Sequence, residues 1–174
     1  MKKGISIIAI ALGLLLSFNT NAQKIGHIDA EQLLLAMPET KRAQDSITMA
    51  GKELERVLAE LQGEYTKLVD TYVANEANWT TLTKDIKQKE IQDKQKRIQE
   101  FSQTAQQDIQ QMEVRMLQPI IAKATKAVQE VAKEENFTYI IDSSPSKAVL
   151  LFSENGEDIM DKVKAKLGIA PKAP

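Results

Sequence analysis

Apolar residues recur at alternating intervals of four and three along the middle of the sequence. In residues 39–75 the series is Leu54, Leu58, Leu61, Tyr65, Leu68 and Tyr72. Such heptad spacing is typical of a helix that packs along one stripe against another helix. A second stripe, whose spacing drifts from a strict heptad, occupies residues 82–118 at Ile91, Ile98, Phe101, Ala105, Ile109, Met112 and Met116. The pattern predicts two long amphipathic helices.

A short polar break separates the two stripes. Residues 75–82 are rich in Asn and Thr, which are poor helix-interior residues, and Thr83 is placed to cap a second helix. The segments on either side, 39–75 and 82–118, are both 37 residues long. We therefore predict an antiparallel helical hairpin over 39–118 with its tip near 75–82. The alternative is one continuous helix in a parallel coiled coil.

Charge favours the hairpin. Residues 31–80 carry 9 acidic and 5 basic side chains, whereas residues 81–100 carry 4 acidic and 6 basic side chains. The first arm is net negative and the beginning of the second arm is net positive, so the two attract each other when the chain folds back.

The flanking segments, 23–38 and 119–170, are predicted to form one small body. Residues 24–29 form a short strand, and a helix capped by Asp29 follows and ends before Pro38. After the hairpin we expect a helix at 120–135, strands at 137–142 and 148–152, and a terminal helix at 158–167 that stops at Gly168, followed by a tail at 171–174.

The predicted fold class is α+β, mostly α: a long antiparallel coiled-coil hairpin on a small body of β-strands. A body of this size without disulfides or metal rarely holds together alone, so we expect it to oligomerise.

The first 22 residues are predicted to be a cleaved signal peptide. Lys2 and Lys3 precede an apolar run at 5–16, and the segment ends with a small residue, Ala22. The alternative is a membrane anchor, but the run is shorter than the roughly 20 residues that a spanning helix needs. The mature chain, 23–174, is therefore expected to be exported.

Composition excludes most classes of catalytic and metal site. The chain has 23 basic and 24 acidic side chains, one His and no Cys. Near-neutral charge argues against a nucleic-acid partner bound by bulk phosphate neutralisation. Without Cys there is no disulfide, thiolate nucleophile or thiolate metal site, and one His excludes multi-His metal sites. No Gly-rich phosphate loop is present, so we predict no enzyme activity, no cofactor and no metal.

The order of these elements resembles the OmpH/Skp family of periplasmic chaperones. The resemblance rests on the strand Lys24–Asp29, the long hairpin, the Leu117-Gln118-Pro119-Ile120 segment, the strand Tyr139–Asp142 and the terminal Asp158-Ile159-Met160-Asp161. It implies a homotrimer in which strands of three subunits form a barrel-like core and three hairpins enclose a cavity. It also implies a periplasmic function in holding unfolded outer-membrane proteins.

Two functions of different classes remain open from the sequence. The first is an ATP-independent holdase, which binds unfolded outer-membrane proteins by mass action and prevents their aggregation. The second is a structural envelope spacer or adaptor, whose hairpins dock on one fixed partner.

Candidate contact residues lie near the predicted tip. Tyr72 and Trp79 either fill the seam between the arms or touch unfolded clients. Lys87 and Lys89 belong to a basic tract that is either a solvated helix face or a weak attractor for acidic clients and for lipid head groups at a membrane surface. Pro119 is expected to kink the helix where arm meets body, and a hinge there is a further hypothesis.

Overall fold

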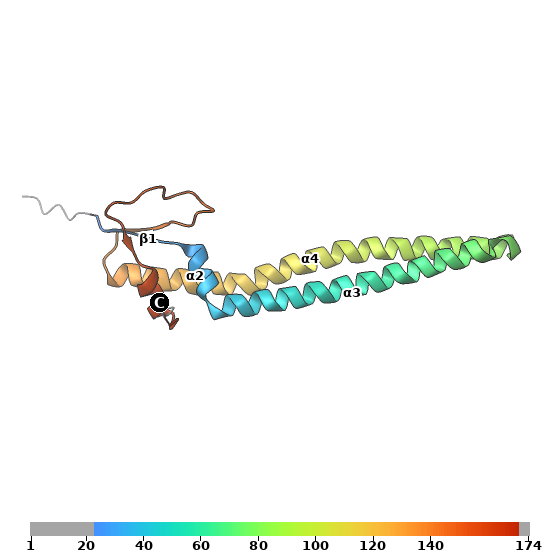
Figure 1. Ribbon diagram of the computed structural model, residues 1–174, viewed down its shortest axis with the longest axis horizontal. Helices are drawn as coiled ribbons and strands as arrows, with labels where there is room; N and C mark the ends of the chain where they lie inside the picture. The colour runs from blue at the N-terminus through green and yellow to red at the C-terminus, as the bar shows by residue number, and fades with distance from the viewer. Residues whose placement is uncertain (1–22, 171–174) are drawn as a thin grey trace, which may run out of the picture.

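The computed structural model describes residues 23–170, which form a long two-helix rod projecting from a small head (Figure 1). The elements, in chain order, are β1 (Ile25–Ile28), α2 (Ala30–Ala36), α3 (Pro38–Asn75), the 3-10 turn η1 (Glu76–Asn78), α4 (Thr81–Glu134), β2 (Tyr139–Asp142), β3 (Glu157–Asp158) and α5 (Met160–Lys166). We call residues 45–118 the hairpin and the other described residues the head. The predicted signal peptide and tail lie outside the described residues.

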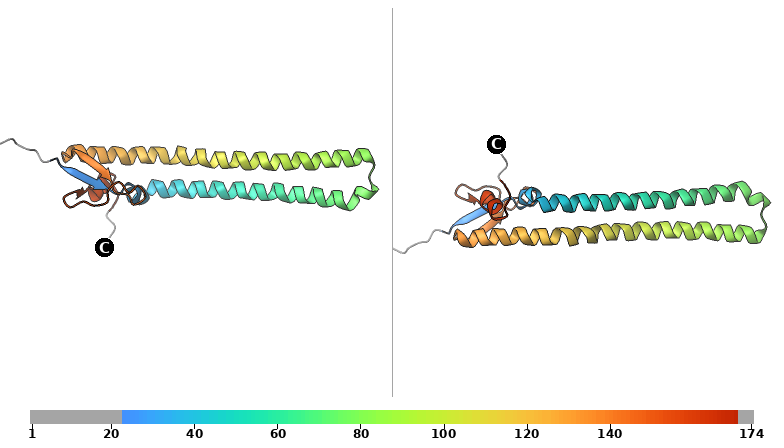
Figure 2. Two further views of the ribbon diagram at one scale, coloured as in Figure 1. Left: turned by 90° about the horizontal axis from the view of Figure 1, so that it is seen from above. Right: turned by 90° about the horizontal axis from the view of Figure 1, so that it is seen from below.

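The hairpin is confirmed. Helices α3 and α4 run side by side in opposite directions in both views of Figure 2. Leu58 of α3 and Phe101 of α4 line one groove, as the antiparallel register requires. The residues of both predicted stripes are half-buried, and most of the side chains between them are exposed. The apolar spacing therefore identified the packed face of each arm correctly.

Two ion pairs join α3 to α4. In the hairpin, Lys94 Nζ lies 2.6 Å from Glu64 Oε2, and in the head, Lys123 Nζ lies 2.6 Å from Glu39 Oε1. The other ion pairs within the two long helices join residues three or four apart on one helix, and Lys166 of α5 pairs with Glu130 and Glu134 of α4. Charge therefore adds little to the pairing of the arms, since exposed pairs of this kind contribute about 1 kcal/mol or less each.

The start of the second arm differs from the prediction. Helix α4 begins at Thr81, with Thr80 as its N-cap, and the Thr80 side chain accepts a hydrogen bond from the Thr83 backbone N at 3.2 Å. Thr83 is thus the recipient of a cap and not the cap itself. Several Thr residues in succession made the sequence ambiguous, and the tight η1 turn decides between them.

Pro119 does not end the second arm. It lies inside α4, which is one helix of 54 residues from the tip into the head. A proline inside a helix removes one backbone hydrogen bond, but neighbouring turns can carry the helix through it. In the described residues, no helix contains a stretch long and apolar enough to span a membrane.

The head contains a three-stranded parallel sheet in the order β2-β1-β3. The register pairs Ile25 with Tyr139 and Ile28 with Asp142, so β1 is joined to a strand that follows the entire hairpin. Gly26 permits this close pairing, because a Cβ there would lie 2.8 Å from Ile140 Cδ1 and 2.9 Å from Phe137 Cε1.

The predicted strand at 148–152 is wrong. This segment belongs to the loop between β2 and β3, and the third strand is the two-residue β3. Ala148 has a positive φ of 48°, and the side chains of Leu151 and Phe152 are 88% and 80% exposed. Strand propensity reflects a surface on which side chains can pack, and a single chain offers this segment none.

The buried core lies entirely in the head. It is formed by Ile28, Leu33, Met37, Ala43, Ile120, Ala124, Ala127, Val131, Ile159 and Val163. Asp29 caps α2 as predicted, with its Oδ1 accepting from Gln32 N at 2.9 Å. The terminal helix α5 ends before Gly168, whose φ of 70° is the left-handed conformation expected after a helix.

Candidate functional site

The predicted aromatic residues meet at the tip of the hairpin. The rings of Tyr72 and Trp79 pack edge to face, with centroids 5.8 Å apart and planes at 68°. Gln88 Nε2 of the second arm donates a hydrogen bond to the Tyr72 hydroxyl at 2.7 Å. Both aromatic side chains are half-buried. They therefore stabilise the tip, as the seam interpretation expected, and each keeps an accessible edge.

Half of the six basic side chains at residues 84–97, near the tip, are paired within the described residues. Lys87 Nζ lies 2.8 Å from Glu90 Oε2, and Lys94 is paired with Glu64 across the arms. Lys96 faces Glu100 at 3.6 Å. Lys89 is exposed and makes no ion pair within residues 23–170. Paired and unpaired basic side chains are interspersed along the tract, so the solvated-face and weak-attractor interpretations both stay predictions. Contact between clients and Tyr72, Trp79, Lys87 or Lys89 stays a prediction.

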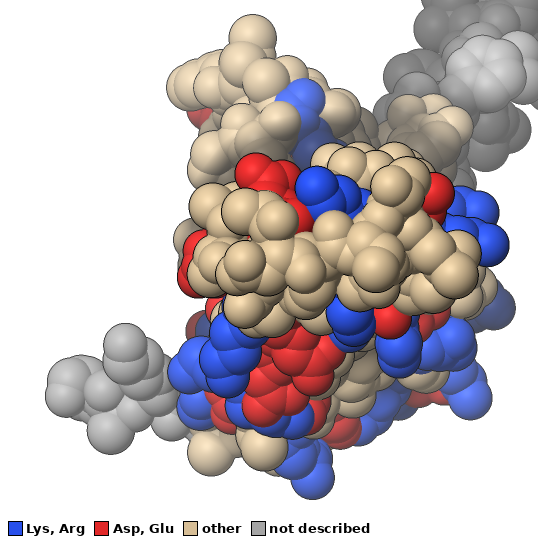
Figure 3. Space-filling model, turned by 90° about the vertical axis from the view of Figure 1, so that its right-hand side faces the viewer, with Lys and Arg blue, Asp and Glu red and all other residues tan. Residues whose placement is uncertain are grey.

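Sequence reasoning missed three exposed apolar side chains near the tip. Val73, Leu82 and Ile86 are all more than half exposed. Figure 3 looks onto the tip and shows an uncharged band across it, with charged side chains both above and below this band. Each of them lies next to a half-buried seam position, where an exposed polar residue is the usual choice. An apolar residue beside the predicted stripe could therefore have identified them from the sequence.

Two further concave surfaces lie between elements. A groove of about 450 Å³ runs between the arms along Leu54, Leu58, Phe101, Ala105 and Ile109. A second, of about 410 Å³, lies where the head meets the hairpin and is lined partly by Leu34, Leu35, Leu117 and Ile121. Pro119 lies in the same stretch of α4 as this second groove, at the opposite end of the hairpin from Tyr72 and Trp79.

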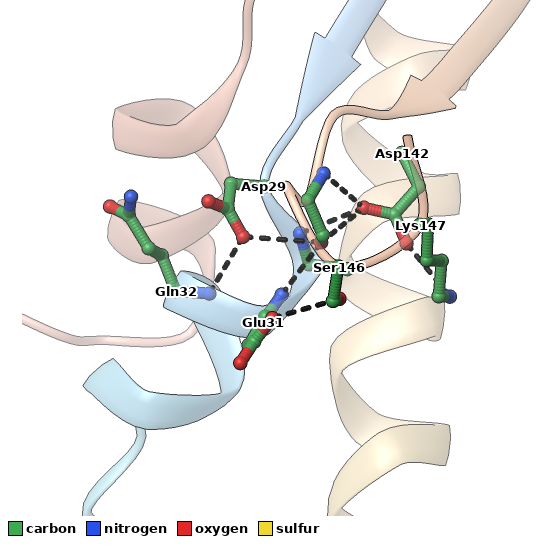
Figure 4. Close-up of polar contacts among 8 residues, drawn as sticks. Asp29, Glu31, Gln32, Asp142, Ser146 and Lys147 are labelled. Atoms are coloured by element: carbon green, nitrogen blue, oxygen red, sulfur yellow. Dashed lines mark hydrogen bonds and ion pairs between the residues drawn. The ribbon is translucent and has the colours of Figure 1, made fainter. Parts of the chain in front are cut away.

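A polar cluster fixes the start of the β2–β3 loop against α2 (Figure 4). The Asp142 Oδ1 atom accepts hydrogen bonds from Ser144 N at 3.0 Å and Ala30 N at 3.3 Å, and Ser144 Oγ lies 2.5 Å from it. Lys147 Nζ lies 2.8 Å from Asp142 Oδ2. Burial raises the pKa of Asp142, but the hydrogen bonds from Lys147, Ser144 and Ala30 outweigh it and hold the pKa well below its usual range.

The same cluster leaves the apolar part of the loop exposed. Ser146 Oγ donates to Glu31 Oε2 at 3.0 Å, which ties the loop to α2 a few residues before Val149. Val149, Leu151 and Phe152 then project from the head without a partner in the described chain. On the sheet, Ile25 and Tyr139 are paired in register and both are exposed. The head thus presents apolar surface in two places.

Several other carboxylates are held in surface ion pairs. Hydrogen bonds from Lys162 and then Lys24 lower the pKa of Glu135, and a hydrogen bond from Lys94 lowers that of Glu64. Residues 23–170 contain no cluster of three His, Cys, Asp or Glu side chains that could hold a metal ion.

The comparisons with known proteins agree on one family. The family model of outer membrane protein (OmpH-like) matches residues 24–167. A crystal structure from Caulobacter crescentus, described as that of a candidate outer membrane chaperone (OmpH-like), superimposes with a TM-score of 0.73 over 86% of each chain. At 13% sequence identity, this likeness shows the fold. No curated protein matches the sequence.

Proposed function

Because this chain belongs to the OmpH-like outer membrane protein family, a non-enzymatic family, we propose that it is an ATP-independent holdase chaperone. In this proposal it binds unfolded outer-membrane proteins between hairpins, in the periplasm, and prevents their aggregation. The family resemblance drawn from the order of elements is confirmed.

The observation that carries the proposal is the exposed apolar surface of a hairpin without a buried core. No side chain between Ala43 and Ile120 is buried. Val73, Leu82 and the groove beside Leu58 remain accessible to a bound chain. An unfolded barrel protein exposes apolar side chains and unpaired strand edges, which such a surface shields from other unfolded chains. Many weak contacts along the arms add up to useful affinity while each exchanges quickly.

We further propose that the head assembles as a homotrimer. The segment from Val149 to Phe152 has the composition of a strand, and it lacks a partner in the single chain. Pairing it with a neighbouring subunit would bury Leu151 and Phe152 and protect a strand edge. The subunit number of three rests on the family resemblance. Three hairpins projecting from one head would then enclose the client cavity.

Within this proposal, the site residues have distinct functions. Tyr72 and Trp79 contact clients with their accessible edges, and Lys87 and Lys89 supply weak electrostatic attraction to acidic clients or membrane surfaces. Pro119 serves as a hinge at the base of the arms. Hydrogen exchange at residues 117–121 tests the hinge, which predicts faster exchange there than in the neighbouring turns of α4.

An aggregation assay tests the function. A urea-unfolded outer-membrane barrel is diluted into buffer with or without residues 23–174 and without nucleotide, and light scattering is followed. We expect suppression when about one trimer is present per client. Native mass spectrometry of the same mixture should show three chains with one client. A protein that suppresses nothing and copurifies with one stoichiometric partner would instead be the spacer or adaptor.

A further inference from the structure

The two broad sides of the hairpin differ in chemistry. On α4, the residue that directly follows each half-buried seam position, from Lys87 to Ile109, is an exposed amide or hydroxyl side chain: Gln88, Gln92, Gln95, Gln99, Ser102, Gln106 and Gln110. The series repeats with the heptad spacing of the seam itself. These side chains therefore form one continuous polar, uncharged stripe along the edge of the helix.

Helix α3 adds uncharged residues to the same side. The positions that follow its seam residues are Glu55, Ala59, Gln62, Thr66, Val69 and Val73. Glu55 lines the groove between the arms together with Ser102, Gln106 and Gln110, which places the two sets on one side of the hairpin. We call these two sets together the amide face; Glu55 is its only charged residue.

The opposite side is strongly charged. Most positions that precede the seam residues are ionised: Glu53, Glu60, Glu64 and Lys67 on α3, and Glu90, Asp93, Arg97, Glu100 and Asp108 on α4. Glu64 and Lys67 line a separate groove with Leu68 and Lys94. We call this side the charged face. None of its positions from 86 to 108 is Gln, so the stripe does not simply reflect a Gln-rich helix.

We propose that the amide face is the surface on which the hairpin binds the peptide backbone of unfolded client chains. The proposal rests on the holdase function and specifies which side of each arm contacts the client. Since the charged face carries nine of these ionised side chains and the amide face carries only Glu55, the charged face is the side that faces solvent in the loaded complex.

The chemistry of the groove supports this occupant. A client segment lying on Leu58, Phe101 and Ile109 loses water from its own N–H and C=O groups, and a buried backbone group without a hydrogen-bond partner is unfavourable. A Gln amide can donate and accept, so it pairs with whichever backbone group faces it. A charged side chain would be a poorer partner, because an ion loses much more free energy of hydration when the client covers it. Recognition through amides is also independent of client sequence, which suits a protein with many clients.

Charge insertion on each face tests the proposal. One variant replaces Gln92, Gln95 and Gln99 with Glu, a second replaces the same residues with Lys, and a control replaces Glu90, Asp93 and Glu100 with Gln. Gln, Glu and Lys have similar helix propensities, so all three should keep the fold, which circular dichroism checks. Affinity is measured by fluorescence anisotropy of a labelled, unfolded outer-membrane barrel at fixed ionic strength.

We expect both amide-face variants to bind about tenfold more weakly, which corresponds to about 1.4 kcal/mol, and the control to change less than about twofold. Opposite effects of Glu and Lys would show that only net charge matters and would overturn the proposal. So would a control that weakens binding as much as the amide-face variants. A wild-type chain that captures no client would instead remove the proposed function itself.

Cross-linking gives an independent readout. The chain has no Cys, so single variants Gln99→Cys and Arg97→Cys can carry a thiol-linked photo-crosslinker on either side of Ile98. We expect several-fold more client cross-linked from residue 99 than from residue 97. Equal yields contradict the proposal. Cross-links from residue 99 mainly to another copy of this chain would assign the amide face to a subunit interface and overturn it as well.

Discussion

The head and the hairpin are built from the same chain on different principles. In the head, Ile159 and Val163 are fully buried, and a polar cluster around Asp142 connects three segments. In the hairpin, even the seam residues are only half-buried. Burial of apolar area is the main favourable term in folding, so stability is concentrated in the head and the arms keep apolar surface accessible. In the proposed holdase, this incompletely buried helix pair supplies the surface that binds clients.

The largest expected loss of stability comes from a pair of matched substitutions, one in the head and one in the hairpin. Leu33→Ala removes a core side chain that is 1% exposed and should cost about 2–5 kcal/mol. Leu61→Ala removes the same atoms from the half-buried seam, so it should cost clearly less. Urea titrations followed by circular dichroism measure both free energies of unfolding. Equal losses would mean that the arms are as well packed as the head.

The second prediction concerns a glycine in the sheet of the head. Gly26→Ala adds a methyl group that meets Ile140 and Phe137 within 3 Å, and such overpacking should cost about 1–3 kcal/mol. The same titration measures the loss. A tolerated Gly26→Ala would show that the sheet of the head is more adaptable than its close pairing suggests.

The third prediction concerns acid. The pKa of Asp142 is lower in the folded chain than in the unfolded chain, so its contribution is present above the unfolded pKa of about 3.9 and is lost as pH falls below it. Asp142→Asn should therefore cost about 1–2 kcal/mol at pH 7. The difference from wild type should shrink as pH is lowered from about 5 to 3. Thermal unfolding at several pH values measures it, and a constant difference would assign the effect to packing.

The smallest expected change in the free energy of unfolding is a stabilisation. Gly63 lies in α3 with open space around its Cα, so Gly63→Ala should stabilise the arm by up to about 1 kcal/mol. Fluorescence of Trp79, the only Trp in the chain, reports unfolding at the tip. If bending at Gly63 helps the arms fit clients, the same variant should capture large barrels less well than small ones.

Local patterns predicted the fold wherever neighbours in sequence decide it. The spacing from Leu54 to Tyr72 identified the packed stripe because helix contacts recur every three or four residues. The strand predicted at 148–152 failed because strand pairing depends on distant partners, and β1 is already flanked by β2 and β3. The N-cap was misplaced at Thr83 because Thr80, Thr81 and Thr83 all fit the cap pattern.

The candidate site was predictable only in part. Tyr72 and Trp79 were correctly placed at the tip, since both follow the heptad of the first arm. The difference between the two sides of the hairpin was missed. Finding it requires comparing the positions on either side of each seam residue, and that comparison needs the register of the arms.

The pairing of β1 with β2 has a consequence for how the molecule is made. Strand β1 precedes the whole hairpin in the chain, and its partner Tyr139–Asp142 comes more than a hundred residues later. Local helix contacts form quickly and distant strand contacts slowly. We therefore expect the arms to pair first and to bring the two ends of the chain together. The sheet would then form as the last step, so an arm that fails to fold back would leave β1 unpaired and prone to aggregate.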